Sequence, residues 1–120
     1  MILLELLKKH CEVARDRFES KAFIAKFSFG EAVVSIRIVL EDQQSGAELV
    51  ITNMTTLPAY SQRRGFGSMA LQIVLELARR SGITNIQAVQ VQMNSEMFWV
   101  KNGFVSMGNI TNDFLYVSKL

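Results

Sequence analysis

A glycine-containing segment, residues 62–70, constrains this chain more than any other stretch. It reads Gln-Arg-Arg-Gly-Phe-Gly-Ser-Met-Ala and lies between an apolar extended run and an amphipathic pattern of helical period. Glycine accepts positive φ and lets a ligand approach the backbone closely. The first N–H groups of a helix lack intrahelical partners and carry the positive end of its dipole. The segment therefore predicts an anion-binding turn at a helix start, and its two arginines favour phosphate oxygens.

Three other interpretations of this segment are weaker. A P-loop needs a Lys-Ser or Lys-Thr pair after its second glycine, and the sequence has none there. The dinucleotide fingerprint G-x-G-x-x-A fits residues 65–70, but residues 58–64 separate it from the preceding strand, and no carboxylate lies near Asn85, where one is expected. A glycine turn that only caps a helix remains possible, although a plain cap does not need two arginines before two spaced glycines.

The composition predicts a single domain over residues 1–120. The chain has 120 residues, of which 49% are hydrophobic, and this is enough to bury a core without disulfides or metals. The one cysteine, Cys11, cannot form an internal disulfide. With one histidine besides, an ordinary protein metal site has too few ligands, so we expect no metal.

Charge and hydropathy limit the partners. The net charge is +2 and no basic-aromatic platform is visible, so we expect no nucleic-acid partner. The apolar start, residues 1–7, contains Glu5 and is followed by two lysines, which argues against a membrane span or a signal peptide. A cytoplasmic protein without a membrane partner is therefore expected.

Hydrophobic periodicity predicts a mixed α/β fold. Helices are expected over residues 2–18, 68–81 and 94–101, and strands over residues 22–29, 32–40, 48–57, 83–92, 105–110 and 114–119, with a polar loop at 41–46. Apolar residues lie nearly all round the second helix, so both of its faces should be covered, and Gly82 should end it in a left-handed conformation. The strands on either side of that helix should be parallel neighbours.

Residues 62–67, Gln-Arg-Arg-Gly-Phe-Gly, resemble the Q/R-x-x-G-x-G/A signature of the GNAT superfamily of acyl-CoA N-acyltransferases. The elements that follow, down to the turn Asn102-Gly103-Phe104, are similar to that family in order, over about residues 47–120. The resemblance implies a GNAT-like fold, with a central mixed sheet of about six strands and about three helices. The family usually begins with a further strand and a helix pair over the acceptor site, so this chain resembles an N-terminally shortened member.

The resemblance also implies acetyl-CoA as co-substrate and a set of residues that bind it. The diphosphate contacts fall on Gln62, Arg63, Arg64, Gly65, Phe66, Gly67 and Ser68. The backbone near Thr55 and Leu57, at the end of the preceding strand, would bind the pantetheine arm, and Asn94 is a further contact.

The family's catalytic groups match this sequence less well. The tyrosine that donates a proton to the leaving thiolate corresponds to Trp99, whose indole N–H donates hydrogen bonds but is no acid. We therefore interpret Trp99 as core or pocket wall. The strand carboxylate that takes the amine proton corresponds to Ile51, so the nearest candidate base is Glu48.

The implied activity is transfer of an acetyl group from acetyl-CoA to a primary amine of a small molecule, a peptide or a protein. Without a strong base, an amine of low pKa is favoured: at about pH 7.4, deprotonating a lysine amine costs about 4 kcal/mol, whereas an α-amine costs less than about 1.5 kcal/mol. The alternative is a CoA-binding module without transfer activity that acts through a partner, which the missing tyrosine and carboxylate favour. The apolar start, with Ile2, Leu3, Leu6 and Leu7, also predicts a homodimer.

Overall fold

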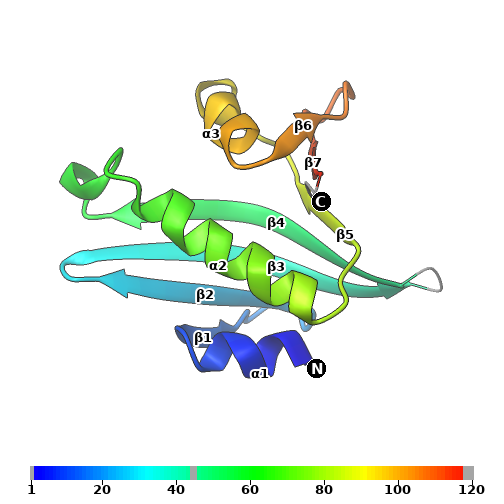
Figure 1. Cartoon of the computed structure of the whole chain (residues 1–120), viewed down its shortest axis with the longest axis horizontal. Helices are drawn as coiled ribbons and strands as arrows, with labels where there is room; N and C mark the ends of the chain where they lie inside the picture. Colours follow the sequence, from blue (N-terminus) through cyan, green and yellow to red (C-terminus); the bar gives the residue numbers. More distant parts are fainter. Residues whose placement is uncertain (1, 44–45, 118–120) are drawn as a thin grey trace.

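The computed structural model describes residues 2–43 and 46–117, which form a sheet of seven strands and three α-helices (Figure 1). In chain order these are α1 (Ile2–Lys8), β1 (Glu12–Arg15), β2 (Ala22–Phe29), β3 (Ala32–Gln43), β4 (Gly46–Leu57), η1 (Ala59–Ser61), α2 (Phe66–Arg80), β5 (Asn85–Ala88), η2 (Met93–Ser95), α3 (Glu96–Lys101), β6 (Phe104–Ser106) and β7 (Phe114–Tyr116). The strand order is β1-β2-β3-β4-β5-β7-β6. The mixed α/β fold is confirmed, with one strand more than the predicted six.

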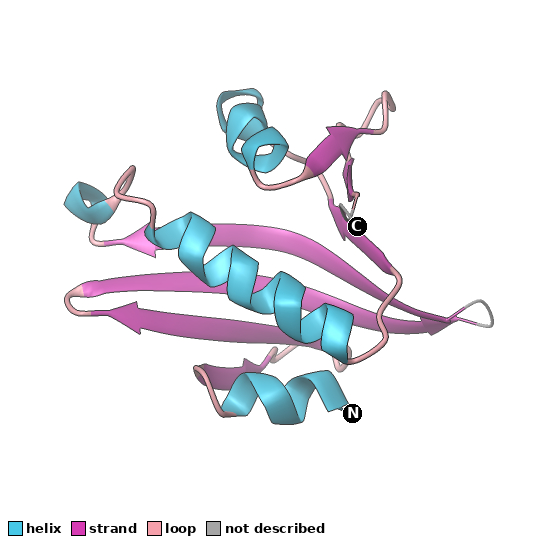
Figure 2. Cartoon of the chain, viewed as in Figure 1, coloured by secondary structure: helices cyan, strands magenta, loops and turns pink. Residues whose placement is uncertain are grey.

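The sheet is antiparallel except where β4 and β5 pair in parallel. This confirms the predicted strand, helix, strand crossover, in which α2 lies across β3 and β4 (Figure 2). Alternate residues of β3, among them Val34, Ile36 and Ile38, are fully buried, because successive side chains of a strand point to opposite faces. The core therefore lies on one face of the sheet, beneath α1 and α2.

The predicted helix over residues 2–18 is wrong in its second half. α1 ends at Lys8, and Glu12–Arg15 form β1, which pairs antiparallel with β2. The edge of β2 offers β1 a row of backbone partners, and β-branched Val13 suits a strand. Pairing with a neighbouring strand thus outweighs the local helical pattern. Leu3 and Leu7 of α1 are fully buried within the chain, so a second copy is not needed to cover them.

The prediction that both faces of the second helix are covered is also wrong. Met69 is 52% exposed, and Gln72 and the two arginines at the C-terminal end are exposed as well. The predicted end of this helix is confirmed, because Gly82 has φ of 78°. Gly82 N–H donates to Arg79 O and Ile83 N–H to Ala78 O, both at 3.1 Å. This pair of bonds is the Schellman motif that satisfies the last carbonyl groups of a helix.

Other strand boundaries differ from the predicted ones. The predicted loop 41–46 is shorter, because β3 continues to Gln43 and β4 begins at Gly46; residues 44–45 lie outside the described part. The predicted strand 83–92 shrinks to β5, and the last two strands shrink to three residues each, while residues 118–119 lie outside the described part. Among the described helices, none is long and apolar enough to cross a membrane.

Candidate functional site

β4 and β5 diverge towards the C-terminal end of β4, as Figure 1 shows, and a groove lies beside this end of β4. Their parallel pairing ends at Ile51 and Ala88. Beyond this point Val91 N–H donates to Asn112 O at 3.0 Å, and Asn112 Nδ2 donates to Val91 O at 2.6 Å. The chain after β5 is therefore bonded to the loop before β7, and the C-terminal end of β4 keeps an edge that β5 does not cover.

The groove has a volume of about 860 Å³ and lies between the end of β4, the start of α2 and α3. Its lining comes from β4 (Met54, Thr55, Thr56, Leu57), from the turn into α2 (Gln62, Arg63, Gly65, Gly67, Ser68) and from η2 and α3 (Ser95, Met97, Phe98, Trp99, Lys101). Both charged side chains of this lining, Arg63 and Lys101, are cationic. The groove is therefore suited to a long ligand that carries negative charge.

Two glycines shape the end of the groove at α2, for different physical reasons. Gly65 is the N-cap residue with φ of 87°, a conformation that favours glycine, and no side chain caps the helix there. Gly67 lies in a tight space, because a Cβ atom on it would lie 3.1 Å from Met54 Cε and 3.4 Å from Phe98 Cε1, and both side chains would have to shift slightly. The first N–H groups of α2, which no side chain caps, thus lie beside the groove, where an anion can bind them.

The turn before α2 is held by its own side chains. Gln62 Nε2 donates to Thr56 O at 3.1 Å, which ties the turn back to β4. Arg63 has φ of 65°, an uncommon conformation for a residue with a Cβ. Phe66 stacks on Phe29 with ring centroids 5.3 Å apart. Of the predicted diphosphate residues, Arg64 and Phe66 do not line the groove and the other five do.

The predicted pantetheine residues, Thr55 and Leu57, both line the groove, but Asn94 does not. Asn94 is exposed in η2 and accepts a hydrogen bond of 3.4 Å from Ser95 Oγ. Ser95, its neighbour, lines the groove instead.

Glu48 lies far from the groove. It is seven residues before Thr55 on β4, about 23 Å at the usual rise of a strand. Its Oε1 accepts a hydrogen bond of 2.8 Å from Gln87 Nε2. The geometry therefore gives no support to Glu48 as a base, and the described lining of the groove contains no carboxylate.

Trp99 is part of the core and also of the groove wall. It is 7% exposed and packs edge to face against Phe98 and Phe104, with ring centroids 5.2 and 5.1 Å apart. This placement agrees with its interpretation as core or pocket wall.

Asn102, which the sequence predicts only as part of the turn Asn102-Gly103-Phe104, is a structural residue of the site. It is 7% exposed. Its Nδ2 donates to Ser68 Oγ at 3.1 Å and to Phe98 O at 2.8 Å, and its Oδ1 accepts from Gln72 Nε2 at 3.1 Å. Asn102 therefore joins the end of α3 to the first turns of α2, and so fixes two walls of the groove relative to each other.

Known proteins show similarity to both the sequence and the fold. The model of the Acetyltransferase (GNAT) family matches residues 4–104. Among curated proteins, no sequence matches the chain.

Solved structures of similar fold include Arabidopsis thaliana Naa50 in complex with the bisubstrate analogue CoA-Ac-MVNAL, with a TM-score of 0.57 and 24% identity over 82% of this chain and 72% of that one. Ard1 from Thermoplasma volcanium has a TM-score of 0.54 and 17% identity over 97% of this chain and 78% of that one. AtaTR bound with AcCoA has a TM-score of 0.57 and 14% identity over 79% of this chain. The chain covers 65% of that AtaTR structure, slightly less than two thirds.

Proposed function

The chain belongs to the acetyltransferase (GNAT) family, and on that basis we propose that it transfers an acetyl group from acetyl-CoA to a primary amine of a small molecule, a peptide or a protein. The observation that carries the proposal is the groove along the open edge of β4, which ends at the glycine-lined, uncapped start of α2. A long ligand with a phosphate group part-way along it matches both features.

The residues of the groove suit acetyl-CoA in two places. A diphosphate fits the first N–H groups of α2 at Gly67 and Ser68, beside Arg63, because helix dipole and guanidinium both favour negative charge. The amide groups of a pantetheine arm fit the backbone of Met54 and Thr56 at the edge of β4 that β5 does not cover. Thr55 and Leu57 lie in the same stretch, but their backbone groups face their partners Ser35 and Val33 on β3. Arg64 lies close enough in sequence to add positive charge at the same end.

The bound thioester would supply an activated acyl group, and the protein would hold the thioester and the amine in position. Holding the amine and the acyl carbon in one place raises their effective concentration. A thiol has a pKa of about 8.5, so it leaves near neutral pH with little help from an acid. Because no carboxylate, histidine or tyrosine belongs to the described lining, the amine has to arrive neutral. We therefore propose an acceptor of low pKa, such as an α-amine.

The second candidate function is a CoA-binding module without transfer activity. The same absence of an acid and a base in the described lining, together with Trp99 at the wall, favours it. The two candidates differ in one measurable property, the release of free thiol from acetyl-CoA in the presence of an amine.

An acceptor screen tests the proposal. The protein is incubated with acetyl-CoA and a library of amines, and free thiol is followed against a reaction without acceptor. We expect release with α-amines, at least about a hundredfold faster than with lysine-type amines at neutral pH, which follows from the difference between their pKa values. Binding of acetyl-CoA with no release for any amine would instead establish the binding module.

Assembly and location are further proposals from the sequence. We propose a homodimer in the cytoplasm, although the burial of Leu3 and Leu7 within the chain leaves mainly Ile2, 65% exposed, as the apolar surface of α1. Sedimentation at micromolar concentrations measures the assembly, and a monomer throughout would refute the dimer.

A further inference from the structure

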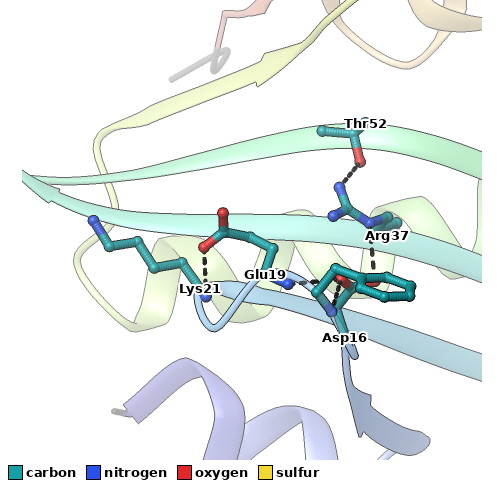
Figure 3. Close-up of polar contacts among 6 residues, drawn as sticks. Asp16, Glu19, Lys21, Arg37 and Thr52 are labelled. Carbon is teal, nitrogen blue, oxygen red and sulfur yellow. Dashed lines mark hydrogen bonds and ion pairs between the residues drawn. The ribbon is translucent and has the colours of Figure 1, made fainter.

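A polar cluster lies on the face of the sheet opposite α2, and the groove does not use it (Figure 3). Its centre is Arg37 of β3. The neighbours of Arg37 along the strand, Ile36 and Ile38, are fully buried against the helices, so Arg37 points to the other face. Figure 3 shows its side chain between Thr52 of β4 and Asp16, which follows β1.

The guanidinium of Arg37 is held at two points. Its Nη1 donates to Thr52 Oγ1 at 2.8 Å, and its Nε lies 3.4 Å from Asp16 Oδ1. Asp16 is fixed in turn, because its Oδ2 accepts hydrogen bonds from the N–H groups of Phe18 and Glu19, both at 3.0 Å. These N–H groups, that of Phe18 first, and the guanidinium lower the pKa of the Asp16 carboxyl. The carboxylate therefore stays charged and keeps Arg37 in one orientation.

The guanidinium still has free hydrogen-bonding capacity. An arginine side chain has five N–H donors, and two of those of Arg37 are used. Within residues 2–43 and 46–117, no acceptor is found for the others, and the side chain is 30% exposed. A planar fork of N–H groups that is fixed and open to solvent is suited to a carboxylate, which it can bind with two parallel hydrogen bonds.

Arg37 lies opposite a β-bulge of β4, next to the point where β4 and β5 separate. Arg37 pairs with Asn53 and Ile38 with Ile51, so Thr52 is the extra residue of a β-bulge. Ile51 is also the last residue of β4 that pairs with β5. The hydroxyl that Arg37 binds therefore belongs to the point where the two strands begin to separate. Arg37 lies behind that point, on the face away from α2.

We propose that Arg37 binds a carboxylate of the acceptor, so that the acceptor is an amine that also carries a carboxylate. The inference rests on the proposed function: Arg37 binds Thr52 beside the point where β4 and β5 begin to separate, so an acceptor held by Arg37 would approach the groove from the face opposite α2. Free amino acids and peptides with an acidic residue beside the terminal amine share this chemistry. Plain amines and carboxamides lack it.

Binding to the CoA-loaded protein tests the inference without requiring turnover. Calorimetry compares each of the common amino acids with its carboxamide, and short peptides with and without Asp or Glu at the second position. We expect at least one carboxylate compound to bind about tenfold or more tightly than its uncharged partner, the range for a charge-assisted hydrogen bond. A preference in the amino-acid series identifies an α-carboxylate as the group that binds, and a preference in the peptide series identifies a side-chain carboxylate.

Arg37→Gln should remove this preference, and Arg37→Lys should keep part of it, because lysine retains the charge but not the fork. Lys26→Gln is the matched control: Lys26 is exposed two residues from Ile24, the partner of Arg37, and so points to the same face. It removes one positive charge and should leave the preference intact. Thermal unfolding checks that each variant is folded.

Equal binding of carboxylates and carboxamides by the wild-type protein would overturn the inference, and so would a preference that survives in folded Arg37→Gln. Neither result affects the proposed acetyl transfer, which is measured separately by thiol release with plain amines. Conversely, a carboxylate preference that depends on Arg37, without thiol release from any acceptor, would support this site and refute the transfer.

Discussion

Trp99 occupies the groove wall without providing a group that can donate a proton to a leaving thiolate. The ring packs against Phe98 and Phe104 and lines the groove, but an indole N–H does not release a proton in the ordinary pH range. Activity that depends on Trp99 would therefore depend on shape and on one hydrogen bond.

We predict that Trp99→Phe lowers turnover by less than about tenfold in a folded variant, because the indole N–H contributes at most one neutral hydrogen bond of about 0.5 to 1.5 kcal/mol. The pH profile should rise as the acceptor amine loses its proton and should show no falling limb from an enzymic acid. Steady-state rates across pH measure both. A hundredfold loss in a folded variant with normal acetyl-CoA affinity would make the indole a catalytic group.

Single residues also show what the sequence can reveal about the site. Gly65 and Gly67 could be recognised because a positive φ and a tight space both favour glycine. The contact of Asn102 with Ser68 could not, because the two residues lie 34 positions apart. The same holds for Arg37, whose partners come from two other segments.

At the level of elements, the groove depends on how α3 is attached to α2. The Asn102 side chain donates a hydrogen bond to Ser68 of α2 and accepts one from Gln72 of α2, which join the two helices. It donates a third to Phe98 O within α3. Their loss would remove the side-chain link between the two helices and would let the two walls of the groove separate.

Asn102→Ala should therefore lower the free energy of unfolding by about 2 to 3 kcal/mol and weaken acetyl-CoA binding. Asn94→Ala is the matched control, because Asn94 is exposed and outside the groove, and exposed substitutions usually change stability by less than about 0.5 kcal/mol. Urea unfolding and calorimetry measure the two effects. Similar values for the two variants would contradict the structural role of Asn102.

The elements were predictable where periodicity is local and strong. The residues of β2 were predicted without error, since alternation of buried and exposed side chains is a local property. The strand β1 and the early end of β5 were not predicted, because each depends on bonds to another segment: β1 pairs with β2, and Val91 is bonded to Asn112.

At the scale of the whole molecule, three carboxylates among the described residues link stability to pH. The pKa values of Asp16, Glu76 and Asp113 are lowered, chiefly by hydrogen bonds from Phe18 N–H, the Arg79 side chain and Gln90 N–H, respectively. A carboxyl group whose pKa is lower in the folded state stabilises the fold above its unfolded value and loses this effect as pH falls through the folded value.

We therefore predict that the melting temperature falls below about pH 4, near the unfolded pKa values of about 3.9 for Asp and 4.3 for Glu. Asp113→Asn should reduce the slope of this fall, because it removes one of the three carboxyl groups. Thermal unfolding from pH 6 to about pH 2.5 measures the slopes. A melting temperature that stays constant over this range would contradict the linkage.

The central claim is that the turn into α2 binds the diphosphate of acetyl-CoA, and calorimetry of glycine-loop variants tests it most directly. Gly67→Asp places a side chain and a negative charge in the space beside Met54 and Phe98. Met69→Asp places the same charge in the same turn but on the exposed outer side, since Met69 is 52% exposed and outside the groove. We predict binding of acetyl-CoA by the wild-type protein, a loss of at least about a hundredfold in affinity for Gly67→Asp, and a much smaller loss for Met69→Asp. Unchanged affinity in folded Gly67→Asp would show that the diphosphate lies elsewhere.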